Sequence, residues 1–143
     1  MRIIGIDGGA SKVSGGIVEK INLNTFKLVE PAVDIKYIEH PNYNTDFLPL
    51  PLYLQSENRI SPNEKNQGSV FIDCVLEVIQ SLADSNPIQV AIAMPGIKNK
   101  EGRGIIAMAN GPRIPDFCDQ IEHIINLKQP IQRLESDADM CTW

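Results

Sequence analysis

The segment GIDGGASK, residues 5–12, places an acid, two glycines, a hydroxyl and a lysine directly after an apolar run. Glycines remove side-chain bulk, so the backbone N–H groups of such a turn can point at a phosphate. Asp7 would hold Mg²⁺ directly or through water, and Ser11 and Lys12 would add a hydroxyl donor and a cation. The pattern predicts a phosphate-binding turn, with a plain β-hairpin as the alternative, because Asp-Gly is also the commonest hairpin signal.

Two further acids, Asp137 and Asp139, follow a short apolar stretch near the end of the chain. If that stretch is a strand of the sheet that contains residues 2–7, Asp7 and Asp137 emerge on the side of the sheet where ligands usually bind. Asp137 would then accept the proton of a hydroxyl nucleophile, while Asp7 organises the metal and the phosphates. Helix capping is the alternative for both late acids, because Asp is favoured in a first helical turn without any chemistry.

The first half of the chain must position Asp7. Residues 2–7 and 12–21 read as two strands joined in a hairpin, and a third strand is expected within residues 26–40. Residues 41–68 follow no regular period and are frequent in Asn, Pro, Ser and Gly, so we expect an excursion from the core there, partly a loop or a flap. Apolar residues at three- and four-residue intervals then predict a helix over residues 69–84.

The second half alternates between short apolar runs and one further helical pattern. The expected elements are strands at 89–94 and 104–108, a helix over 115–127, a last strand at 131–134 and the start of another helix. A leading antiparallel meander followed by this alternation predicts an α/β fold with a mixed five-stranded sheet flanked by helices, the ribonuclease H-like layout. All 143 residues are expected to form a single domain.

The composition excludes several classes of protein. The apolar and charged fractions, 43% and 22%, are those of an ordinary globular chain. The net charge of −5 and the scattered Lys and Arg argue against a nucleic-acid partner. No long apolar run or leader pattern is found, so we expect a cytoplasmic protein without a membrane partner. Cys74, Cys118 and Cys141 have neither disulfide-framework nor metal-ligand spacing, which favours reduced structural cysteines.

Three stretches, taken in order, resemble one family. GIDGGASK (5–12), AIAMPGIKNKEGRGIIAMAN (91–110) and ESDADM (135–140) are similar to the phosphate motif, the sugar loop and the catalytic segment of ROK-family sugar kinases and repressors. The resemblance spans nearly the whole chain. The first motif alone is shared across the sugar kinase, actin and Hsp70 superfamily, so the ordered trio carries the specificity.

The resemblance implies an ATP-dependent kinase that phosphorylates a hydroxyl of a hexose or hexosamine. By that likeness Asp7 would bind the metal, and the turn would surround the phosphates of ATP. Gly96, Asn110 and Ser136 would line the sugar site, and Asp137 would be the general base. The residues implied at the phosphates and the metal are Asp7, Gly8, Gly9, Ala10, Ser11 and Lys12.

The chain departs from the family pattern at several points. Ser136 stands where the family has Asn, and Ala10 stands where it has Gly. The excursion at residues 41–68 is longer than the family predicts. The second lobe, with its second phosphate loop and adenine pocket, is not in this sequence, so we expect an N-terminal lobe whose partner is the missing C-terminal lobe and which is inactive alone. A homodimer is left open.

Two other classes stay in view. A small two-metal nuclease of the same fold would use Asp7, Asp137 and Asp139 as metal ligands. Against it stand the negative net charge and the proline-glycine loop, for which a nuclease has no use. A non-catalytic lobe that only binds a sugar or a partner is the third possibility, and the change to Ser136 keeps it open.

Overall fold

A computed structural model describes residues 2–22, 25–28, 32–83 and 88–135 of the chain. Its centre is a mixed sheet in the order β3-β2-β1-β5, in which β4 also pairs with β2. Only β1 and β5 are parallel; the other pairs are antiparallel. The strands are β1 (Arg2–Gly8), β2 (Lys12–Asn22), β3 (Thr25–Leu28), β4 (Val33–Lys36) and β5 (Val90–Ala93).

The hairpin predicted at the start of the chain is confirmed, because β1 and β2 pair antiparallel from Arg2 with Glu19 to Gly8 with Val13. The prediction of a single third strand within residues 26–40 is wrong, because two strands form there. That segment forms β3 and β4, which pair with different parts of β2. A short 3-10 helix, η1 (Tyr37–Glu39), follows β4.

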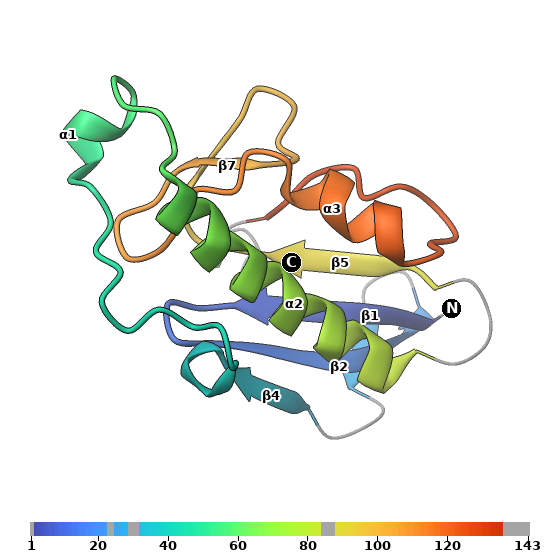
Figure 1. Cartoon of the computed structure of the whole chain (residues 1–143). Coiled ribbons are helices and arrows are strands. Elements are labelled where there is room, and N and C mark those ends of the chain that lie inside the picture. The colour runs from blue at the N-terminus through green and yellow to red at the C-terminus, as the bar shows by residue number, and fades with distance from the viewer. Residues whose placement is uncertain (1, 23–24, 29–31, 84–87, 136–143) are drawn as a thin grey trace.

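Helix α2 (Pro62–Leu82) covers the sheet (Figure 1). The predicted helix at 69–84 is confirmed, but it begins earlier, so the irregular excursion ends near residue 61 and not at 68. Ser61 caps the helix, since its Oγ accepts a hydrogen bond from Glu64 N at 3.1 Å, and Pro62 suits the first turn. The excursion itself contains one short helix, α1 (Leu52–Gln55).

The core lies between α2 and the sheet. Val75, Val78 and Ile79 of α2 are fully buried, as are Ile6 of β1 and Ile92 of β5. Helix α2 comes so close to β2 that a Cβ added to Gly15 would lie 2.4 Å from Val78 Cγ1. Burial of these side chains, worth about 1.5–3 kcal/mol each, is what holds α2 to the sheet.

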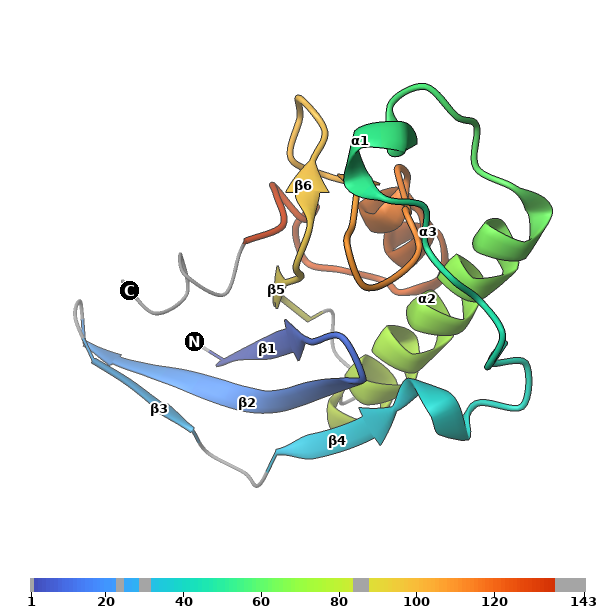
Figure 2. The same cartoon turned by 90° about the vertical axis from the view of Figure 1, so that its left-hand side faces the viewer.

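Helix α3 (Phe117–Ile124) is shorter than the predicted helix at 115–127. It lies on the same side of the sheet as α2, and Figure 2 shows the opposite face uncovered by the described helices. The expectation of helices flanking the sheet on its faces is therefore wrong for the described residues. His123 is exposed on α3.

The predicted strand at residues 104–108 is confirmed as β7 (Ile105–Ala107), but it does not join the main sheet. It pairs antiparallel with β6 (Ile97–Lys98) in a separate small hairpin. This hairpin stands above the end of β5 (Figure 2).

The predicted strand at 131–134 is not formed. Ile131 N donates to the Glu122 carboxylate at 2.8 Å and Leu134 N donates to Gly102 O at 2.7 Å, so these N–H groups do not pair with β5. Only Glu135 joins the sheet, through a parallel bridge to Ala93. The sheet thus has five strands, but residues 131–134 are not one of them. The predicted third strand forms two separate strands instead, β3 and β4.

Cys74 and Cys118 are buried and unpaired, as predicted. Burial raises the pKa of Cys74 to about 11 and that of Cys118 to about 12, so both remain thiols at neutral pH. Cys141 lies outside the described residues. No helix within the described ranges is long and apolar enough to cross a membrane.

Candidate functional site

The predicted phosphate turn connects β1 to β2. Gly9 N donates to Lys12 O at 2.8 Å, which closes the turn, and Ala10, Ser11 and Lys12 are exposed. A Cβ added to Gly8 would lie 2.0 Å from Met94 Sδ, so the glycine lets the Met94 side chain pack closely against the start of the turn. The turn therefore combines a fixed backbone with accessible side chains.

Asp7 lies at the carboxyl end of β1, with its side chain exposed. It is in register with Ala93 at the end of the parallel strand β5. Because carboxyl ends of parallel strands meet at one edge of a sheet, the phosphate turn and the segment after β5 lie together. This is the side of the sheet on which the sequence placed the site.

The segment after β5 makes a sharp turn at Pro95 and Gly96. Gly96 has φ +100°, and a Cβ there would lie 2.7 Å from Ala107 O, so only glycine fits without strain. Lys98 Nζ donates to Met94 O at 2.6 Å and to Gly96 O at 2.7 Å, and these two bonds stabilise the turn.

These segments enclose a cleft of about 370 Å³. Its lining brings together residues that are far apart in the sequence and that were predicted to bind phosphate or sugar: Gly9, Ala10, Gly96 and Asn110. The rest of the lining comes from Leu52, Pro95, Ile97, Ala107, Met108 and Ala109. The predicted residues Asp7, Gly8, Ser11 and Lys12 do not line the cleft themselves but belong to the turn at its edge.

Lys12 is directed toward β4. Its Nζ lies 3.4 Å from Asp34 Oδ2, and both side chains are about half exposed. Hydrogen bonds from Ser14 and from Lys12 hold the pKa of Asp34 below its ordinary value. An exposed pair of this kind is weak, so the amino group of Lys12 can leave it for an anion at the turn.

Sequence reasoning missed the contribution of the excursion to the cleft. Helix α1 brings Leu52 to its wall, and the buried side chain of Gln55 bonds to the backbone of Met108. The only signal was the run of apolar residues in PNYNTDFLPLPLYLQ, which has no regular period. Nothing in that run indicates which distant loop it contacts.

The ability of the site to hold a metal rests on Asp7. Among the described residues no three His, Cys, Asp or Glu side chains gather in one place. Mg²⁺ with a nucleotide is usually bound by one or two carboxylates, with water and phosphate oxygens as the other ligands. A single exposed carboxylate beside a phosphate turn fits that donor set. The acids that a two-metal nuclease would add, Asp137 and Asp139, lie outside the described residues.

Ser136 and Asp137, predicted to bind the substrate and to act as base, also lie outside the described residues. The last described residue, Glu135, bridges to Ala93, which is itself in register with Asp7. Glu135 N donates to Ile92 O and Met94 N donates to Glu135 O, both at 2.9 Å. The chain before Asp137 therefore runs beside the strand next to Asp7.

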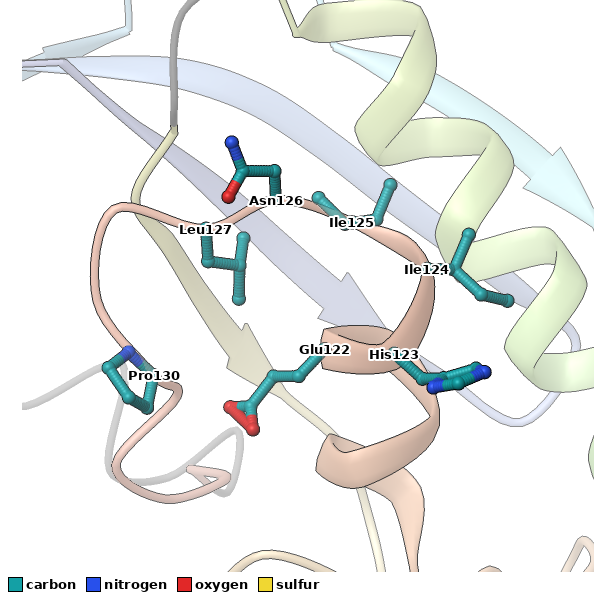
Figure 3. Close-up of a pocket in the computed structure, with 7 residues that line it drawn as sticks. All are labelled: Glu122, His123, Ile124, Ile125, Asn126, Leu127 and Pro130. Atoms are coloured by element: carbon teal, nitrogen blue, oxygen red, sulfur yellow. The ribbon is translucent and has the colours of Figure 1, made fainter.

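A second pocket, of about 390 Å³, lies at the end of α3 and contains none of the predicted residues. Figure 3 shows Glu122 and His123 pointing away from each other there. The carboxylate of Glu122 already binds Arg103, with Nη2 to Oε1 at 2.6 Å, and accepts from Ile131 N. Its polar group is thus engaged in holding the fold, and the first cleft is the better candidate site.

No protein-family model and no curated protein sequence matches this chain. Its fold is similar to a solved structure described as a ROK family glucokinase from Streptomyces griseus in complex with glucose and AMPPNP. The TM-score is 0.65 at 15% sequence identity, over 100% of this chain and 35% of that chain. The chain thus spans about a third of that glucokinase, and the likeness between the two is one of fold.

Proposed function

We propose that this chain is the N-terminal lobe of an ATP-dependent kinase that transfers the γ-phosphoryl group to a hydroxyl of a hexose or hexosamine. The observation that carries the proposal is the cleft, where the phosphate turn at Gly9 and Ala10 meets Gly96 and Asn110. The similarity in fold to a glucokinase supports the same class. The neighbour's bound glucose and AMPPNP are the reason to test these two ligands first.

The proposed roles follow from the chemistry of the side chains. The exposed carboxylate of Asp7 binds Mg²⁺, which neutralises charge on the phosphates when it is bound. Gly9 N is taken by Lys12 O, so the turn from Gly8 to Lys12 holds the phosphates through its other backbone N–H groups, the Ser11 hydroxyl and the Lys12 ammonium. Catalysis of phosphoryl transfer is largely positioning and charge stabilisation, so the exposure of this turn suits it.

The sugar is proposed to lie in the cleft between the proline-glycine turn and Asn110, whose side chain is exposed. Gly96 lets the turn after β5 pack closely on β7, which shapes the cleft, and the amide of Asn110 can both donate to and accept from a hydroxyl. Ser136 and Asp137 would complete the site, with Asp137 taking the proton of the attacking hydroxyl. The second lobe supplies the rest, so the isolated chain is expected to be inactive.

The test is a kinase assay on the full-length protein with ATP, Mg²⁺ and a panel of aldohexoses and hexosamines. Asp137→Asn is expected to lower kcat by roughly 10²–10⁴-fold with sugar binding retained, because a general base acts mainly in the transition state. Asp7→Asn should raise the Mg²⁺ concentration needed for half-maximal rate. Glu77→Gln makes the same carboxylate-to-amide change on the exposed side of α2 and should alter neither.

Wild-type protein that phosphorylates none of these sugars would overturn the proposal. Normal turnover in Asp137→Asn would remove that residue from the mechanism. Mg²⁺-dependent cleavage of branched DNA by the chain would instead favour the nuclease.

A further inference from the structure

Gln55 connects α1 to the loop that carries Asn110. The Gln55 side chain is buried, and its Oε1 accepts from Met108 N at 2.9 Å. Its Nε2 donates to Met108 O at 2.8 Å and to Leu50 O at 2.7 Å. One amide side chain thus satisfies both backbone groups of Met108, in the way that a neighbouring strand would. Because a buried amide costs free energy unless it is paired, this geometry is strongly held.

The other end of the same loop is held by Arg113. Its guanidinium binds the carboxylate of Glu64 from α2 through two bonds, Nε to Oε2 at 2.9 Å and Nη2 to Oε1 at 2.8 Å. Its Nη1 donates to Gln55 O at 2.6 Å and to Asn58 O at 2.9 Å. Arg113 and Glu64 are each about 5% exposed. The loop is therefore fixed on both sides of Asn110 by buried polar groups.

The same arrangement places Leu52 in the cleft. Helix α1 lies beside the β6–β7 hairpin (Figure 2), and Leu52 lines the cleft together with Ile97 and Ala107. The Leu52 side chain is 48% exposed, so it is available to a ligand. The wall opposite the phosphate turn is thus apolar at Leu52 and polar at Asn110.

We propose that α1 determines the substrate specificity of this cleft: Gln55 is a positioning residue for Asn110, and Leu52 is the apolar wall that selects among sugars. This inference rests on the proposed kinase function and deepens it. A polar substituent of the sugar that faces Leu52 loses its water without gaining a partner, whereas one that faces Asn110 gains a hydrogen bond. The substrate class is therefore a sugar with one apolar or reduced position toward α1.

The first experiment uses Gln55→Glu in the full-length protein. The new carboxylate can still accept from Met108 N, but it faces the carbonyls of Leu50 and Met108 with no donor. We expect the KM for the sugar to rise by about tenfold or more at pH 8 with the KM for ATP unchanged. Burial and the two carbonyls favour the protonated form of the new group, which restores one donor, so the sugar KM should fall toward wild type at about pH 5.5.

Gln80→Glu is the matched control, because it makes the same amide-to-carboxylate change in another helix. Gln80 is exposed on α2 and does not line the cleft. We expect its sugar KM to stay within about twofold of wild type at each pH. A Gln55→Glu protein whose sugar KM equals wild type at pH 8 would overturn the positioning role.

The second experiment tests Leu52 directly. Leu52→Asn is expected to fold, since the side chain is half exposed, and so it keeps the inference testable even if Gln55→Glu does not fold. The ratio of kcat/KM for glucose to that for each monodeoxyglucose should change by about tenfold at one ring position. Leu48→Asn is the control: Leu48 is 85% exposed and does not line the cleft. Equal ratios in wild type and Leu52→Asn would overturn the specificity role.

Amide hydrogen exchange separates failure of this inference from failure of the proposed function. In this chain without any sugar, Gln55→Glu should speed exchange of the Met108 amide, and Gln80→Glu should not. Faster exchange with an unchanged sugar KM overturns the inference and leaves the kinase intact. A wild-type protein that phosphorylates no sugar overturns the proposed function, and the role of Leu52 with it.

Discussion

The two sides of the cleft are built in different ways. The phosphate turn from Gly8 to Lys12 is closed by one local hydrogen bond, Gly9 N to Lys12 O, and its polar side chains face solvent. The opposite loop, residues 94–113, depends on buried groups from distant parts of the chain, chiefly Gln55 and Glu64. The phosphate turn thus has one closing bond of its own and one bond from outside, from Tyr37 N to Ser11 O at 3.1 Å, whereas the opposite loop depends on buried side chains from distant segments.

This difference indicates a division of work. A phosphate turn must offer N–H groups and a cation to a ligand that is nearly constant, so a short local structure suffices. A sugar loop must hold one side chain in a defined place, and a rigid buried network does that at the cost of desolvating an ion pair. Mutations in the two regions should therefore differ in what they damage.

Arg113→Ala should have the largest effect on stability. It leaves the Glu64 carboxylate buried without its guanidinium partner and the carbonyls of Gln55 and Asn58 without a donor. Removing one partner of a buried pair costs about 3–5 kcal/mol, so the midpoint of urea unfolding should fall sharply. Arg103→Ala is the comparison, because Arg103 is paired with Asp119 and Glu122 in a more exposed position and should cost less.

The pH dependence of the same pair follows from Glu64. Burial alone would raise its pKa, but hydrogen bonds from Arg113 hold the pKa below its ordinary value. A lowered folded-state pKa gives stability that is present above the unfolded-state pKa of about 4.3 and is lost as the pH falls through the folded-state value. The stability difference between wild type and Glu64→Gln should therefore shrink on acidification below that pH. A difference that stays constant from pH 7 to 3 would contradict the assigned pair.

Gly96→Ala should lower the free energy of unfolding by an intermediate amount, and the matched change in the phosphate turn should lower it less. Gly96 has φ +100° and a close backbone neighbour in Ala107 O, so alanine is strained there by about 1–3 kcal/mol. Gly9→Ala is the matched change on the phosphate side. Its φ is not positive, and a Cβ would lie 3.4 Å from Lys12 O, so a change in unfolding free energy of no more than about 1 kcal/mol is expected. Thermal unfolding of both variants measures this difference. Equal losses of stability in Gly96→Ala and Gly9→Ala would contradict the strain assigned to Gly96.

The fold was predictable where the pattern is local. The apolar run in residues 2–7 that ends at an Asp-Gly turn, and the spacing of Val75, Val78 and Ile79, indicate a hairpin and a helix from local sequence alone. The strand expected at 131–134 failed because the N–H groups of Ile131 and Leu134 are taken by Glu122 and Gly102. Such competition for backbone groups depends on tertiary contacts, which no short window of sequence contains.

Some residues of the candidate site could be predicted from the sequence, and others are recognised only in the folded structure. Gly9 was predicted from the glycine-rich turn and Gly96 from the family resemblance, and both line the cleft. Gln55 and Arg113 could not be found, because a Gln or an Arg in an irregular stretch is normally solvated and only the fold buries them. Ser61 and Glu64 have the spacing of a capping box, and this signal for the start of α2 was missed.

Lys12→Ala should have the smallest effect on stability and the most selective effect on binding. Within the described part of the chain Lys12 pairs with Asp34 across an exposed surface, where such pairs contribute little, so the unfolding midpoint should not move measurably. Lys36→Ala is the control, because Lys36 is exposed on β4 and in register with Lys12. If the turn binds phosphates, Lys12→Ala weakens Mg·AMPPNP binding to the full-length protein and Lys36→Ala does not. If both substitutions weaken Mg·AMPPNP binding equally, the two lysines act only through their charge. That result would contradict a specific contact between Lys12 and the phosphates.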